Sequence, residues 1–228
     1  MSAERPVYDR SQSKVEVSGF EARHYDLLMN LITAGTYPLF IRRVVRDMGI
    51  RPMDAILDLG AGTGRNAELM ARYLSDQGRI VGLDVGAEML AQAQARFDGS
   101  ANVNFERRSI TEDLPYQQEF DKVFMAFVLH GFVQEDRQRI VANAHRALKV
   151  GGEFLILDYA AFESEEAMWP VRWAFRYAEC PLASDFARRD WPAILAAQGF
   201  GHFRSHHYYL GYVRLLAARK EAAPLVGE

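Results

Sequence analysis

The chain has 228 residues, of which 49% are hydrophobic and 25% charged, and its formal net charge at pH 7 is -3. A chain of this length and composition can bury a sizeable core, which excludes a mainly disordered chain, a collagen and a disulfide miniprotein. The single cysteine, Cys180, is typical of a reducing compartment. The negative net charge argues against a general polyanion binder, so no nucleic-acid partner is expected.

The N-terminal region is polar. Residues 1–20 lack the apolar stretch of a secretory signal and predict a loose arm. No uncharged apolar run reaches the roughly 20 residues that a membrane-spanning helix needs. We therefore expect a cytoplasmic protein, with peripheral contact to a membrane surface left open. Residues 21–228 predict a single domain, and its first part, residues 21–50, predicts two helices, Glu21–Thr33 and Leu39–Met48.

Strands and helices then alternate along the chain. Apolar runs predict strands at Ala55–Leu59, Arg79–Leu83, Val103–Glu106, Asp121–Phe127 and Glu153–Leu157. Helical periodicity predicts helices at Asn66–Leu74, Ala87–Phe97 and Asp136–Leu148. This alternation predicts βαβ units and a parallel sheet of the α/β class, and the nearly continuous apolar strands suit a sheet covered on both faces.

The sequence becomes rich in aromatic residues after the last of these strands. Residues 160–190 include Trp169, Trp173 and Tyr177, which could wall an apolar acceptor site or belong to a packed core. A helix is expected at Asp190–Gln198, followed by strands at His202–Tyr209 and Tyr212–Ala218, joined at Leu210-Gly211.

A glycine-rich loop carries the strongest chemical signal. The segment Asp58-Leu-Gly-Ala-Gly-Thr-Gly64 follows a strand and precedes a helix, so a ligand can lie against its main chain. Gly62–Ala67 also satisfies the dinucleotide pattern G-x-G-x-x-G/A, with Asp84 as a candidate ribose-binding acid. However, Asp58 would repel a diphosphate and attract the ammonium group of S-adenosylmethionine. The sign of the charge favours S-adenosylmethionine, and a nicotinamide-dependent oxidoreductase is the alternative.

Five segments occur in one order: Asp58–Gly64, Val81–Asp84, Leu114–Tyr116, Phe120–His130 and Leu148–Asp158. As an ordered set they resemble the class I S-adenosylmethionine-dependent methyltransferases, over roughly residues 54–220. The nearest branch in character is the menaquinone and ubiquinone C-methyltransferases. The resemblance implies a Rossmann-like, seven-stranded, mostly parallel sheet with helices on both faces and a C-terminal antiparallel hairpin.

The resemblance also implies a function. We expect methyl transfer to a small apolar or aromatic acceptor, with quinone-like C-methylation as the leading hypothesis. Residues 21–50 would act as lid helices, and residues 160–190 would be an insertion that covers the active site. Phospholipid or other small-molecule N-, O- or S-methylation is one alternative, and a non-catalytic S-adenosylmethionine-binding module is another. A monomer and a homodimer both stay open.

The cofactor residues follow from the same resemblance. In that family the glycine loop lies under the methionine moiety, an acid matching Asp84 binds the ribose hydroxyls, and residues matching Val85 and Met89 flank the adenine. Residues matching Ser109 and Ile110 close over the adenine, although the acid that many relatives carry there is missing. The expected cofactor contacts are Asp58, Gly60, Ala61, Gly62, Thr63, Gly64, Asn66, Asp84, Val85, Met89, Ser109, Ile110, Ala126, Phe127, Tyr25 and Tyr37. Tyr25 and Tyr37 could instead pack their own helices.

His130 is the candidate general base. It follows the fourth predicted strand, at the carboxyl edge where open α/β sheets bind ligands, and imidazole suits proton transfer near neutrality. The alternative is a histidine that only shapes the pocket. The expected acceptor pocket comprises Asp158, Tyr159, Trp169, Trp173 and Tyr177.

Two further side-chain patterns predict no chemistry. His206 and His207 are adjacent on a strand and point to opposite faces, so no metal site is expected. Arg42-Arg43 and Arg188-Arg189 are typical of solvated faces.

Overall fold

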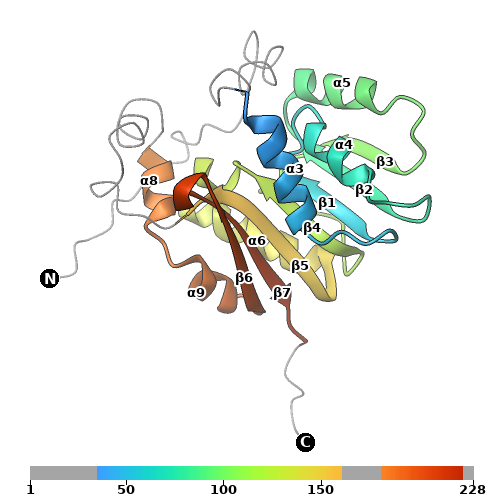
Figure 1. The fold of residues 1–228 in the computed structure, drawn as a ribbon. Helices are drawn as coiled ribbons and strands as arrows, with labels where there is room; N and C mark the ends of the chain where they lie inside the picture. The colour runs from blue at the N-terminus through green and yellow to red at the C-terminus, as the bar shows by residue number, and fades with distance from the viewer. Residues whose placement is uncertain (1–34, 161–180, 223–228) are drawn as a thin grey trace, which may run out of the picture.

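Seven strands form one mixed sheet in the order β3-β2-β1-β4-β5-β7-β6. The computed structural model describes residues 35–160 and 181–222, and Figure 1 shows their arrangement. The strands are β1 (Ala55–Leu59), β2 (Arg79–Asp84), β3 (Val103–Arg107), β4 (Phe120–Ala126), β5 (Leu148–Tyr159), β6 (Phe200–Tyr208) and β7 (Val213–Lys220). Strands β1 to β5 pair in parallel, whereas β7 is antiparallel to both β5 and β6. The expected Rossmann-like sheet and its C-terminal antiparallel hairpin are therefore confirmed.

Helices cover both faces of this sheet (Figure 1). The helices are α3 (Tyr37–Asp47), α4 (Arg65–Ala71), α5 (Ala87–Arg96), α6 (Gln134–Ala147), α8 (Pro181–Ala187) and α9 (Trp191–Ala196). Two short 3₁₀ turns, η2 (Leu129–Gly131) and η3 (Tyr209–Gly211), follow β4 and β6. Helices α3, α4 and α5 share one hydrophobic cluster with the sheet, and α6, α8 and α9 share the other.

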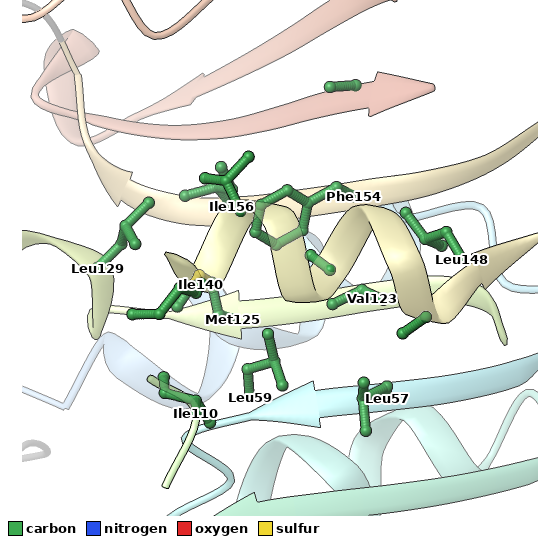
Figure 2. Close-up of a cluster of buried hydrophobic side chains, with 14 of the residues drawn as sticks. Leu57, Leu59, Ile110, Val123, Met125, Leu129, Ile140, Leu148, Phe154 and Ile156 are labelled. Atoms are coloured by element: carbon green, nitrogen blue, oxygen red, sulfur yellow. The ribbon is translucent and has the colours of Figure 1, made fainter. Parts of the chain in front are cut away.

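The two clusters follow from the alternation of side chains along each strand. In β1, Ile56 belongs to the cluster of α3, α4 and α5, whereas Leu57 and Leu59 belong to that of α6. Figure 2 shows the second cluster, with Ile140 of α6 lying over the strands. Since both faces are buried, all five residues of β1 are buried, as the apolar run predicts.

Several element boundaries differ from the sequence predictions. Strand β5 begins at Leu148, not at Glu153, because Leu148 already pairs with Phe120 before Gly151 turns the chain at a φ of +81°. Helix α4 ends before Leu74, because the last N–H groups form tighter bonds to the third residue back. Helix α8 was not expected from the pattern.

Parts of the prediction fall outside the described residues. These are the arm at 1–20, the helix at Glu21–Thr33 and residues 161–180 of the expected insertion. In the remainder of that insertion, α8 packs against η2 and β5. No helix within the described ranges has the length and apolarity needed to cross a bilayer.

Candidate functional site

The glycine loop lies at the carboxyl ends of β1 and β2. Gly60, Gly62 and Gly64 have φ values of +80°, +54° and +75°, a conformation that L side chains rarely adopt. At Gly60 an added Cβ would come within 2.6 Å of the side chain of Val128, just past β4, so no larger residue fits there. At Gly62 an added Cβ would meet no atom within 4 Å, which leaves this side of the loop open for a ligand.

Most N–H groups of the loop already donate to protein acceptors. Gly60 and Ala61 both donate to the carbonyl of Leu83, at 2.8 and 2.9 Å. Gly62 donates to Oδ2 of Asp84 at 2.8 Å, and Gly64 donates to the carbonyl of Ala61 at 3.0 Å. These four donors are therefore committed to the loop's own shape and are not directed at an anion.

Asp84 connects β2 to the loop with both carboxylate oxygens. While Oδ2 accepts from Gly62, Oδ1 accepts from the N–H of Gly86 at 2.8 Å, just before α5. The carboxylate thus holds the loop and the start of α5 together. The sequence pattern indicated that Asp84 is a site residue, but this bracing role was not predicted.

A second brace was missed by the sequence analysis. Arg96, in the last turn of α5, donates from Nε to the carbonyl of Thr63 at 3.1 Å, and from Nη1 to Oε2 of Glu68 in α4 at 2.8 Å. The sequence could not predict this contact, because an exposed basic residue in the last turn of a helix is common and does not indicate a particular partner.

Asp58 is a carboxylate buried next to the loop. It is 1% exposed, and its Oδ2 has no hydrogen-bond partner among the described residues. Burial, together with the charge of Asp84, raises its pKa from 3.8 to about 7. Oδ1 of Asn66, at the start of α4, is a second buried acceptor without a partner in the described part of the chain. The loop therefore has acceptors beside it that would suit a cationic ligand.

The raised pKa of Asp58 predicts a specific pH dependence. Between pH 3.8 and about 7 the folded chain binds more protons at Asp58 than the unfolded chain does. The free energy of unfolding therefore falls as pH rises through this range, because the buried side chain must give up its proton. We expect Asp58→Asn to raise the free energy of unfolding at about pH 8 by on the order of 3–4 kcal/mol, and by clearly less at about pH 5. Urea unfolding at both pH values measures this difference.

The exposed Asp98 offers the matched control, because Asp98→Asn should change stability little at either pH. An equal effect of Asp58→Asn at both pH values would show that this carboxyl does not titrate between them.

The expected adenine side is formed by the start of α5 and the segment after β3. Met89 and Ile110 are 4% and 6% exposed, and Ser109 Oγ lies 2.9 Å from Oγ1 of Thr111. Asn143 of α6, which the sequence analysis did not single out, donates to the carbonyls of Ile110 and Glu112 at 2.9 and 2.6 Å. This segment is therefore held in place by a buried amide.

Tyr37 lies on the other side of the loop. It is the first residue of α3 and 6% exposed, and the guanidinium of Arg65 stacks over its ring at 4.8 Å. Because Arg65 begins α4, this contact brings α3 to the end of the glycine loop. Its direct role toward a cofactor stays a prediction.

His130 and Asp158 form a pair at the ends of β4 and β5. Nδ1 of His130 lies 2.9 Å from Oδ1 of Asp158, and Oδ2 accepts from the main-chain N–H of His130 at 3.2 Å. The N–H of Tyr159 also donates to Oδ1, at 2.9 Å. Asp158 is 2% exposed, and its carboxylate contacts both the main chain and the ring of His130, which orients the imidazole. When Nδ1 carries the proton, the lone pair of the neutral ring is on Nε2.

Aromatic rings continue around this pair. The ring of Tyr159 lies 5.0 Å from that of His130 and 6.0 Å from that of Phe127, and Phe186 of α8 lies 6.5 Å from His130. Phe127 has a φ of +55°, rare for a bulky residue, where the chain leaves β4 beyond Ala126. Among the described residues, this edge of the sheet thus combines aromatic rings with the imidazole of His130, which can accept a proton.

Arg137 of α6 supports the His130 turn and was also missed by the sequence analysis. Its side chain is 0% exposed and donates to the carbonyls of Leu129, His130 and Leu182 at 3.1, 2.9 and 2.8 Å. Its charge is paired with Asp185 of α8 at 2.6 Å.

Asp185 also binds Arg189 at 2.8 Å, so the prediction that Arg189 belongs to a solvated face is wrong. Burial acts to raise the pKa of Asp185, but the bonds from Arg189 and Arg137 outweigh it and lower the pKa. No periodicity distinguishes a buried arginine from an exposed one, which is why this cluster gave no sequence signal.

The structure thus brings most of the expected site residues to one edge of the sheet. Asp58, the loop from Gly60 to Gly64, Asp84, His130 and Asp158 all lie where β1, β2, β4 and β5 end. Four other expected residues, Tyr25, Trp169, Trp173 and Tyr177, lie outside the described residues.

Comparison with known proteins shows which proteins the chain resembles. Residues 56–152 match the family described as Methyltransferase domain. The chain is 27% identical, over 166 residues, to the ubiquinone/menaquinone biosynthesis C-methyltransferase UbiE of Marinomonas sp. (strain MWYL1), covering 71% of this chain and 65% of that one. The protein of the same name from Vibrio campbellii is 31% identical over 157 residues, 67% of this chain and 60% of that one. The solved structure of the CurJ carbon methyltransferase is similar in fold, with a TM-score of 0.68 at 16% identity, covering 89% of this chain and 60% of that one.

The order of the sheet, the glycine loop with its two acids and these matches agree on one class. The chain resembles the class I S-adenosylmethionine-dependent methyltransferases, in the match of residues 56–152 and in its fold. Within that class it resembles the UbiE C-methyltransferases, although it spans only 60–65% of the length of the two relatives described.

Proposed function

We propose that the chain transfers a methyl group from S-adenosylmethionine to a ring carbon of a small, apolar hydroquinone-like acceptor. The observation that carries the proposal is the His130–Asp158 pair, 2.9 Å apart, within an aromatic lining at the cofactor edge of the sheet. A carbon acceptor must lose a proton, and this pair supplies an oriented base in apolar surroundings.

The charges at the loop fit the cofactor better than a dinucleotide. Four N–H groups of the loop are already used, so they offer no cradle to a diphosphate. The pKa of Asp58 is already raised to about 7, and a diphosphate would disfavour its ionised form further, whereas a cationic ammonium would favour that form. A cationic ammonium beside Asp58 and Asn66 would find two buried acceptors without other partners in the described residues. We assign Asp58, Asn66 and the open side of Gly62 to the methionine end, and Asp84 to the ribose.

Proton removal is the chemical task of this chain. When bound, S-adenosylmethionine supplies a methyl group already activated on a sulfonium and leaves as a neutral thioether. His130 accepts the acceptor's proton on Nε2, while Asp158 holds Nδ1–H and thereby fixes the tautomer. Tyr159, Phe127 and Phe186 exclude water and place a flat ring near the base.

The acceptor class rests on this lining and on the relatives. The two UbiE proteins are named as C-methyltransferases of ubiquinone and menaquinone biosynthesis. An amine can lose its ammonium proton to water before it reacts, whereas a ring carbon is methylated only with loss of a proton from the acceptor at the site. The His130–Asp158 pair therefore favours carbon over the N-methylation of phospholipids.

Replacing Asp84 tests the cofactor assignment. We expect Asp84→Ala to abolish the thermal stabilisation that S-adenosylmethionine gives to the wild-type chain, because it removes both the proposed ribose contact and the bond to Gly62. A titration by differential scanning fluorimetry measures this, with the exposed Asp76→Ala as the matched control. An unchanged stabilisation in Asp84→Ala would contradict the assignment.

The methyl acceptor needs a separate assay. The wild-type chain is incubated with S-adenosylmethionine and either a short-chain prenylated hydroquinone or phosphatidylethanolamine, and products are analysed by mass spectrometry. We expect a ring-methylated hydroquinone. If methylated phosphatidylethanolamine were the only product, the proposed hydroquinone acceptor would be wrong and a phospholipid amine would take its place. Cofactor binding without a product from either would favour a non-catalytic binding module.

A further inference from the structure

The turn between β6 and β7 holds a leucine in solvent. Leu210 is 83% exposed, and it and Tyr209 have φ values of +58° and +47°. Two consecutive residues other than glycine in this conformation are unusual, because the Cβ atom is crowded against the backbone. Tyr209 anchors the turn: its ring lies 4.7 Å from that of Phe40, and its hydroxyl lies 3.2 Å from that of Thr36. The turn is therefore held in a shape that presents Leu210 outward.

The exposed face of α3 continues this surface. Leu39, Arg42, Arg43 and Arg46 are spaced so that they share one helix face, and all four are exposed, with Leu39 at 69%. Leu39 lies near the N-terminal end of α3, the end that contacts Tyr209, and the three arginines follow it along the helix. Arg43 and Arg46 lie 3.9 and 3.5 Å from the partly buried Asp47, so the face keeps an excess of positive charge.

This surface borders the proposed active site. Val213, at the start of β7, pairs with Tyr159 of the aromatic lining, and the N–H of Ala160 donates to the carbonyl of Tyr212 at 2.9 Å. On the α3 side, Phe40 lies 6.4 Å from Phe127. In Figure 1 the turn after β6 and the first turn of α3 both lie at the edge where β4 and β5 end.

We propose that Leu39 and Leu210, with Arg42, Arg43 and Arg46, dock this edge of the molecule onto an anionic lipid bilayer. Two protruding leucines can enter the acyl boundary while the arginines meet lipid phosphates. The net charge of the chain is -3, so attraction to an anionic surface must come from a local basic face such as this one. The inference rests on the proposed function for the reason to dock, since an apolar hydroquinone resides in the bilayer.

Vesicle co-sedimentation of the full chain tests docking without acceptor or turnover. The probes are vesicles of phosphatidylglycerol with phosphatidylcholine, and of phosphatidylcholine alone. We expect binding to the anionic vesicles that weakens with salt, and much weaker binding to the neutral ones. Leu210→Ser should reduce the partition coefficient by about tenfold, and Arg42→Glu with Arg43→Glu by about 25-fold or more.

Met53 and Val150 provide the matched control. They are 66% and 55% exposed, and they lie before β1 and at the start of β5, at the opposite edge of the sheet. Met53→Ser with Val150→Ser should leave vesicle binding unchanged, and every variant should keep its stabilisation by S-adenosylmethionine. Equal binding by wild type and Leu210→Ser, or no binding to anionic vesicles, would overturn the proposal. A concentration-dependent dimer lost in Leu210→Ser would show instead that a second copy covers this surface. None of these outcomes depends on which acceptor is methylated.

Discussion

His130→Ala is expected to slow methyl transfer by about 10²- to 10⁴-fold, the usual contribution of a positioned general base. Cofactor binding should be unaffected, because none of the cofactor-loop contacts described above involves His130. Initial rates with the hydroquinone acceptor, at saturating S-adenosylmethionine, measure the effect. The exposed His202 gives the matched control, since it lies near the start of β6, at the end of the sheet opposite to the pair with Asp158.

Two further measurements separate base catalysis from pocket shape. Added imidazole should restore part of the rate of His130→Ala if the missing group is a proton acceptor, whereas a lost wall of the pocket would not respond. Asp158→Asn should also slow turnover, because an amide accepting less well from Nδ1–H no longer fixes the tautomer with the lone pair on Nε2. Unaltered turnover in His130→Ala would remove this residue as the base.

The elements that could be predicted from the sequence are those whose signal is local. The apolar run of β1 and the alternating glycines that follow it can be recognised without any distant partner. The negative charge of an Asp58 carboxylate already favoured a cationic ligand at this loop. The predicted position of His130 also follows from a local pattern, since a residue just past a parallel strand must lie at the carboxyl edge.

The parts that were missed depend on contacts between distant segments. Asn143 and Arg137 lie on one helix whose polar residues resemble any solvated face, and only the packed structure shows them to be buried. Helix α8 has seven residues and no clear apolar period, so its position depends on the contact of Asp185 with Arg137. The early start of β5 likewise requires its pairing with Phe120 in β4.

Arg137 should therefore be the most sensitive position for stability in this part of the chain. We expect Arg137→Met to lower the free energy of unfolding by about 3–5 kcal/mol, because it leaves Asp185 buried with only Arg189 and deprives three main-chain carbonyls of their donor. Urea unfolding measures this loss. Arg139→Ala, on the same helix, is the control: its pair with Glu135 is 2.8 Å long, against 2.6 Å for Arg137 and Asp185, but it is exposed, so the loss should be about 0.3–0.5 kcal/mol.

The double variant Arg137→Met with Asp185→Leu distinguishes a costly unpaired charge from lost packing. If the buried carboxylate is the main cost, the second substitution should recover part of the stability, and the two effects will not be additive. Additive losses would mean that the carbonyl contacts dominate. In either case the turnover of folded Arg137→Lys should fall while its cofactor affinity stays, because Arg137 holds the carbonyl of His130 and has no contact with the glycine loop. An Arg137→Met variant as stable as the Arg139→Ala control would contradict the role of Arg137 as the buried link between η2 and α8.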